Sequence, residues 1–155
     1  KGSSHILRII RELIDFKAEN SGTNIAEALR YLSNVIKKKS TAFLISDFMD
    51  DGFEKALQIA NYKHDLIAIR VNDKREFEIP NLGLVRMMDA ESGKTTLVDT
   101  SNSKVRNEYS KIIRKKSTEL DTICGRYGVD FVKVYTGQDY VKPLMKLFKK
   151  RESRK

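Results

Sequence analysis

The sequence has a single cysteine, Cys124, which excludes a disulfide bond within the chain. This favours a reducing compartment, and we predict a cytoplasmic location. There are only two prolines and eight glycines, while hydrophobic residues make up 40% and charged residues 33% of the chain. This composition is typical of an ordered globular protein. No apolar run approaches the roughly 20 residues that span a bilayer, so we expect no membrane segment in this chain.

Acidic residues are in the minority: 30 lysines and arginines stand against 21 aspartates and glutamates, for a net charge of +9. The positive charge is concentrated at 37–39, 111–116 and 149–155. No aromatic residues alternate with these clusters, and no zinc-finger or RNA-recognition signature occurs, so we do not expect nucleic-acid binding. A basic surface also suits an acidic protein partner.

The length of 155 residues corresponds to one ordinary domain. We predict a single domain over 1–150, followed by a basic, disordered tail at 151–155.

Hydrophobic periodicity predicts an alternation of helices and buried strands. Apolar residues at helical spacing alternate with short apolar runs that show no period of two, which suggests strands covered on both faces. The fold class we predict is α/β, with a mostly parallel sheet, helices on both faces and an inserted β-hairpin. The expected helices are 5–16, 23–39, 52–64, 101–127 and 140–150, the expected strands are 41–46, 65–71 and 129–135, and the expected hairpin is 84–99.

A candidate site lies where the first apolar strand ends, because ligands of open parallel sheets bind beyond the carboxyl ends of the strands. Asp47 directly follows the strand 41–46, and Thr23 opens the helix that precedes this strand. Carboxylate and hydroxyl oxygens suit Mg²⁺, which keeps part of its water shell. We expect that helix to begin well away from Asp47 along its own axis, unless the loop before it folds back.

Structural roles explain the same residues. Thr23 or Asn24 is a good N-cap, and Asn24 with Glu27 has the spacing of a capping box. Asp50 or Asp51 could likewise cap the helix that begins near residue 52.

A catalytic alternative is a Mg²⁺-dependent phosphoesterase or nuclease-like enzyme that uses Asp47, Asp50 and Asp51. Two-metal chemistry requires several carboxylates that converge on a pair of ions. No further acid at a strand end clearly joins these three.

Several phrases resemble one family over nearly the whole chain. "HILRIIRELI", "GTNIAEALRYL", "STAFLISDFMD" and "MMDAESGKTTLVDTS" are similar to the von Willebrand factor type A domain, in the bacterial branch called domain-of-unknown-function family 58. The resemblance implies a Rossmann-like fold and a metal-ion-dependent adhesion site that holds Mg²⁺. Its matching ligands here are Thr23 and Asp47. The family's Asp-x-Ser-x-Ser motif, on a strand upstream, does not occur in this chain.

From this difference we expect the chain to be the C-terminal part of a longer protein that lacks the N-terminal strands, with an incomplete site. The resemblance further implies a non-catalytic interaction module in which an acidic side chain of a protein partner completes the coordination of the bound cation. The partner that it suggests is a MoxR-type AAA ATPase. Without its neighbour, the strand 41–46 would become a sheet edge, and we expect self-association through it.

Overall fold

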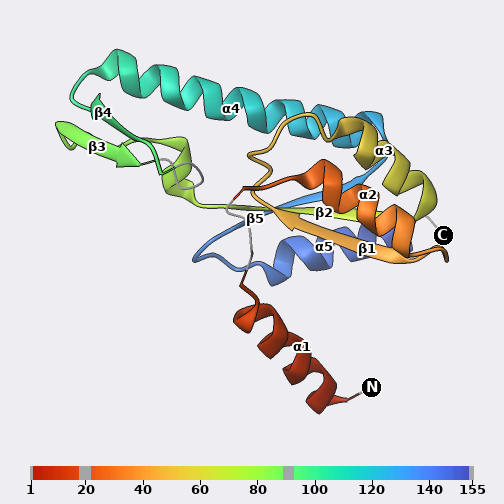
Figure 1. Cartoon of the computed structure of the whole chain (residues 1–155). Coiled ribbons are helices and arrows are strands. Elements are labelled where there is room, and N and C mark those ends of the chain that lie inside the picture. Colours follow the sequence, from red (N-terminus) through yellow and green to blue (C-terminus); the bar gives the residue numbers. More distant parts are fainter. Residues whose placement is uncertain (1, 18–21, 89–92, 154–155) are drawn as a thin grey trace.

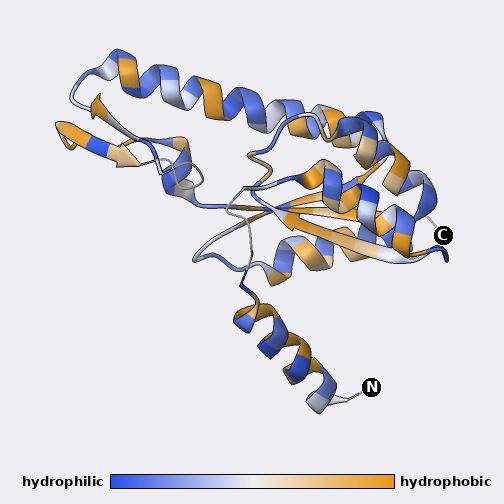
Figure 2. Ribbon diagram, viewed as in Figure 1, coloured by the Kyte–Doolittle hydropathy of each residue, from blue (hydrophilic) through white to orange (hydrophobic). Residues whose placement is uncertain are grey.

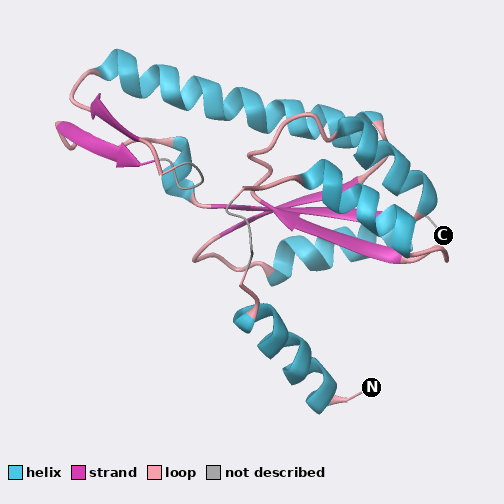
Figure 3. Ribbon diagram, viewed as in Figure 1, coloured by secondary structure: helices cyan, strands magenta, loops and turns pink. Residues whose placement is uncertain are grey.

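The computed structural model describes residues 2–17, 22–88 and 93–153. Helices alternate with strands along most of the chain, as the hydrophobic pattern predicts (Figures 1 and 3). The elements are α1 (Ser3–Asp15), α2 (Ile25–Val35), β1 (Thr41–Ser46), α3 (Glu54–Lys63), β2 (Asp65–Asn72), η1 (Lys74–Phe77), β3 (Leu84–Met88), β4 (Thr95–Asp99), α4 (Ser103–Arg126), β5 (Asp130–Tyr135) and α5 (Val141–Glu152).

Three parallel strands in the order β1-β2-β5 form the main sheet. The register places Thr41 beside Asp65 and Ile67 beside Asp130, so the strands begin and end at common edges. Helices cover both faces, with α2, α3 and α4 on one side and α5 on the other (Figure 1). The predicted α/β class is therefore confirmed.

The core divides along the two faces of β2, whose apolar residues are buried on both sides. Leu66 and Ala68 pack with Leu57 of α3 and Leu120 of α4. Ile67 and its same-face neighbours pack instead against α5. In Figure 2 the strands of the sheet are among the most apolar parts of the ribbon.

Cys124 of α4 lies in the larger core cluster and is almost fully buried. Burial raises the pKa of its thiol to about 11. The side chain therefore stays protonated at neutral pH and serves as a small packed group.

Strand β1 departs from the expectation of coverage on both faces. It is the edge of the sheet in the described part of the chain, and Phe43 and Ile45 are 50% and 63% exposed. On the α2 side, an apolar groove of about 460 Å³ runs along the strand and is lined by Leu29, Leu32 and Leu44. A non-alternating apolar run thus marks strand 41–46 correctly but does not show whether neighbours cover it.

The expected hairpin is confirmed as an antiparallel pair of β3 and β4, although part of its turn lies outside the described residues. Thr100 fixes its base: its buried hydroxyl accepts from Leu82 N at 2.9 Å and donates to Gly83 O at 2.7 Å. The hairpin lies beyond the end of the main sheet, beside the N-terminal half of α4 (Figure 1).

Helix α1 forms where the period predicts it but contributes no buried residue. Its apolar side chains include Ile6, Leu13 and Ile14, which are 58%, 73% and 76% exposed. None of the described helices is both long and apolar enough to cross a membrane.

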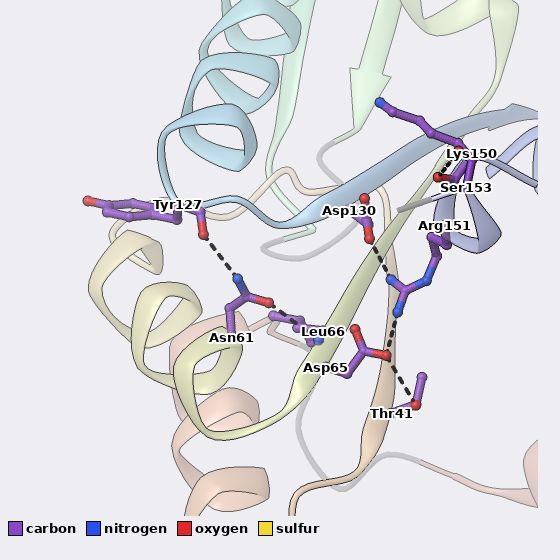
Figure 4. A network of polar contacts seen from close by, with 9 residues as sticks. All are labelled: Thr41, Asn61, Asp65, Leu66, Tyr127, Asp130, Lys150, Arg151 and Ser153. Carbon is purple, nitrogen blue, oxygen red and sulfur yellow. Dashed lines mark hydrogen bonds and ion pairs between the residues drawn. The ribbon is translucent and has the colours of Figure 1, made fainter. Parts of the chain in front are cut away.

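A cluster of polar contacts around Arg151 joins the strands at the amino edge of the sheet (Figure 4). Arg151 of α5 donates to Asp65, the first residue of β2, and to Asp130 Oδ2, the first residue of β5, at 2.5 Å. Thr41, the first residue of β1, donates its hydroxyl to Asp65 Oδ2 at 3.3 Å. The hydrogen bond from Arg151 lowers the pKa of the Asp65 carboxyl below its ordinary value.

This cluster corrects the predicted boundary of the tail. Helix α5 continues to Glu152, so Arg151 and Glu152 belong to the fold rather than to a disordered segment at 151–155. The two carboxylates at the strand ends explain why, because they give Arg151 a fixed, partly buried position. Residues 154–155 lie outside the described part of the chain.

The cluster leads to a prediction about pH. Arg151→Gln should lower the free energy of unfolding by about 1–2 kcal/mol at pH 7, a modest value because Asp65 is partly exposed. Since the folded-state pKa of Asp65 is lowered, the stabilisation is present above its unfolded value near about 4 and is lost as pH falls through the folded value. Urea unfolding of both proteins at pH 7 and pH 3 should show the difference shrinking at low pH.

The control is Arg114→Gln, which removes an exposed pair with Glu78 and should change stability by less than about 0.5 kcal/mol. Equal stability of Arg151→Gln and the wild type at pH 7 would contradict the role of the cluster.

The open edge of β1 leads to a second prediction. The wild-type chain should form dimers or larger species at high protein concentration, because β1 offers unpaired backbone groups and exposed apolar side chains. Ile45→Lys should shift sedimentation profiles toward the monomer. Tyr62→Lys, at an 89% exposed position on α3, should leave association unchanged. A wild-type chain that stays monomeric at high concentration would refute association through this edge.

Candidate functional site

The loop that follows β1 is shaped by two side chains of its own sequence. The Ser46 hydroxyl accepts a hydrogen bond from Phe48 N at 3.0 Å, and Asp47 Oδ1 accepts one from Met49 N at 3.2 Å. Serine and aspartate at the start of a turn favour such local bonds. These bonds turn the chain sharply at the carboxyl end of the strand.

Phe48 has a left-handed backbone with φ of 58°, which is unusual for a residue with a large side chain. This conformation costs about 1–2 kcal/mol. The ring is buried and packs against Phe53 and Phe131, with centroids 5.8 Å and 6.4 Å away. Burial of the ring offsets the strain and fixes the path of the loop.

The N-terminus of α2 meets this same loop. Asn24 is the N-cap, and its Oδ1 accepts from Glu27 N at 2.8 Å. Asp50 Oδ2 accepts from Ile25 N at 2.8 Å, across 25 residues of sequence. The Asn24 carboxamide and the Asp50 carboxylate thus each accept a hydrogen bond from a backbone N–H group of the first helical turn. A negative charge is also favourable at this end of a helix.

This contact corrects the expected position of α2. We expected the helix to begin well away from Asp47, but α2 runs antiparallel to β1, so its N-terminus lies at the carboxyl end of that strand (Figure 1). The hydrogen bond between Asp50 and Ile25 holds the two loops together. The segments that carry Thr23 and Asp47 are therefore neighbours in the fold.

Both proposed cation ligands have exposed side chains. Asn24, not Thr23, supplies the cap, so the Thr23 hydroxyl is not required for that role. Asp47 uses Oδ1 for the bonds with Met49 N and the Ser46 hydroxyl. These hydrogen bonds orient the carboxylate and leave Oδ2 as the oxygen that a cation could bind.

The other two acids of the loop have structural partners. Asp50 accepts backbone N–H groups with both oxygens, from Ile25 and from Asp51. Asp51 forms an exposed ion pair with Lys116 of α4 at 3.5 Å. Neither caps α3, contrary to expectation: Phe53 is the N-cap of that helix and makes no side-chain cap bond.

The chemistry of the donors fits a hard cation, since Mg²⁺ prefers carboxylate and hydroxyl oxygens. Thr23 and Asp47 supply one of each. Within the described residues, no group of three or more His, Cys, Asp or Glu side chains is arranged to hold a metal ion. Further ligands at this position would therefore be oxygens of other residue types, waters or groups from outside the described residues.

Two polar residues at the carboxyl end of β2 escaped the sequence analysis. Arg70 and Asn72 are only 2% and 1% exposed and share a strand face with Leu66 and Ala68. The apolar run of 65–71 predicts a buried strand but does not by itself single out Arg70 within it. A charged residue within an otherwise two-faced buried strand is the signal that could have found it.

Two mycobacterial proteins are similar to this chain in sequence. Uncharacterized protein MAV169 of Mycobacterium avium is 25% identical over 129 residues, which are 83% of this chain and 76% of that protein. Uncharacterized protein Rv1480 of Mycobacterium tuberculosis is 30% identical over 95 residues, which are 59% of this chain and 30% of that protein. The matched segment thus spans less than a third of the second relative.

Among solved structures, the conserved hypothetical protein BatB from Bacteroides thetaiotaomicron is similar, with a TM-score of 0.49 and 16% identity. The match covers 97% of this chain and 71% of that one.

A family model covers most of the chain. It is described as "Protein of unknown function DUF58" and matches residues 1–119, from α1 into the second half of α4. The chain therefore belongs to the DUF58 family.

Proposed function

We propose that the chain is part of a protein-interaction module of the von Willebrand factor type A kind, in which a divalent cation at the carboxyl edge of the sheet mediates the contact. The observation that carries the proposal is the hydrogen bond from Ile25 N to Asp50 Oδ2, which makes the loops of Thr23 and Asp47 neighbours. A hydroxyl and a carboxylate offered from adjacent loops suit Mg²⁺.

The partner in this proposal contributes an acidic side chain. A cation with few protein ligands keeps several waters, and a partner's Asp or Glu can replace one of them. The chain has an excess of nine positive charges, which would steer an acidic partner toward it. A MoxR-type AAA ATPase is the partner suggested by the family resemblance.

We favour a non-catalytic role over a phosphoesterase. The enzyme hypothesis requires Asp47, Asp50 and Asp51 to converge on metal ions. Both carboxylate oxygens of Asp50 instead accept hydrogen bonds from backbone N–H groups, and Asp51 forms an ion pair with Lys116. The loop then has one carboxylate, Asp47, available for a cation.

The test is a thermal melt with Mg²⁺ or Mn²⁺ against EDTA. A cation that binds only the folded chain must raise the midpoint, by RT ln(1 + [L]/Kd) in free energy. The wild type should show this rise, and Asp47→Asn should lose it, because the amide keeps an oxygen for the turn but lacks the charge. Asp51→Asn is the matched control and should retain the rise.

Asp50→Ala separates structure from cation binding. It should lower the midpoint in EDTA, with a cost of about 1 kcal/mol for the lost cap of α2. A wild-type midpoint that does not respond to the cation, or an equal response in Asp47→Asn, would refute the proposed site.

A further inference from the structure

Arg70 is a buried cation in the centre of the sheet. It lies on β2 between β1 and β5 and is 2% exposed. Its Nε and Nη1 have no hydrogen-bond partner in the described structure. Two residues further along the same face, Asn72 is 1% exposed, and neither its Nδ2 nor its Oδ1 is paired.

The neighbours of Arg70 do not neutralise its charge. In register, Arg70 lies beside Ser46 of β1 and Lys133 of β5. Ser46 already accepts from Phe48 N, and Lys133 adds a second positive charge. Lys133 is itself paired with Asp121 of α4 at 2.7 Å, and no ion pair joins Arg70 to an acid within the described residues.

An unpaired buried guanidinium is energetically costly. The cost of removing an ion from water is recovered only when an opposite charge and hydrogen-bond acceptors are supplied. An unsatisfied buried amide adds a further cost. Most buried polar side chains in folded proteins have partners, so Arg70 and Asn72 together indicate a group that the described chain does not supply.

A surface hollow lies on the β5 side of this position, although Arg70 and Asn72 do not themselves line it. It has a volume of about 490 Å³ and lies between β5, α4 and the 3₁₀ helix η1. Its lining includes Lys133 and Tyr135, the β5 residues in register with Arg70 and Asn72. The lining also contains Arg114, Lys133 and Asp121, and both cations are already paired, Arg114 with Glu78 and Lys133 with Asp121.

We propose that Arg70 and Asn72 bind an oxyanion, a phosphate or carboxylate group that enters from this hollow. The planar guanidinium is well matched to two oxygens of such a group and provides the opposite charge. Asn72 Nδ2 offers a further donor on the same face. The proposed oxyanion site uses neither Thr23 nor Asp47, although it lies at the same edge of the sheet, with Arg70 in register with Ser46.

The experiment measures the melting midpoint in EDTA with sodium phosphate, sodium acetate or sodium chloride at matched ionic strength. Phosphate or acetate should raise the wild-type midpoint by several degrees above chloride. A response to phosphate alone assigns the site to a phosphate ligand, and a response to acetate alone assigns it to a carboxylate. Because EDTA removes divalent cations, failure of the cation proposal does not affect this result.

Arg70→Met tests the residue itself. The variant keeps the length of the side chain and removes the charge, so its midpoint in chloride should rise by roughly 2–6 °C and its response to oxyanions should vanish. Arg86→Met, at an exposed position on β3, is the matched control and should respond as the wild type does. Asn72→Leu should weaken the response and provides a second variant if Arg70→Met does not fold.

Two results would overturn the proposal. One is a wild-type midpoint that is the same in phosphate, acetate and chloride, which needs no variant to interpret. The other is an oxyanion response of equal size in the wild type and in a folded Arg70→Met or Asn72→Leu protein.

Discussion

Strand β2 is the constraint on which the rest of the structure depends. It is paired on both sides, and its apolar residues belong to both core clusters. Because β1 and β5 run parallel to it in close register, the three strands begin at one edge and end at the other. The polar residues at the starts of the strands therefore lie at one edge of the sheet, and the polar residues that follow the strands lie at the other.

The two edges are built differently. At the amino edge, Asp65, Asp130 and Arg151 satisfy one another, and Asn61 joins β2 to the end of α4 through Leu66 N and Tyr127 O (Figure 4). At the carboxyl edge, Phe48 has a strained backbone and Arg70 has unpaired buried nitrogens. Strain and unsatisfied polar groups concentrate at functional sites, whereas satisfied networks support stability. The amino edge also holds unpaired buried nitrogens, those of His64, so the strained backbone of Phe48 and the buried charge of Arg70 are what favour the carboxyl edge as the ligand site.

Sequence patterns predicted the elements because periodicity is a local property. The order of helices and strands, the hairpin and the capping role of Asn24 all depend on residues within a few positions of each other. Long-range contacts were not accessible in the same way. The bond between Asp50 and Ile25 and the clamp by Arg151 join segments that no local pattern connects. The expected position of strand 41–46 at a sheet edge is confirmed among the described strands, but that expectation came from the family resemblance; the apolar run itself does not show that the side chains of Phe43 and Ile45 are left exposed.

In the sequence, the hairpin and α4 lie between β2 and β5, which pair with each other in the sheet. This order affects the kinetics of folding. β1 and β2 are joined by one helix, but Ile67 of β2 pairs with Asp130, about sixty residues later in the chain. Closing a longer loop costs more entropy, and non-local parallel pairing slows folding. We therefore expect the segment from α2 to β2 to form an early nucleus and β5 to join it late. Until then β2 has an open edge, and the nascent sheet is exposed to mispairing on both sides.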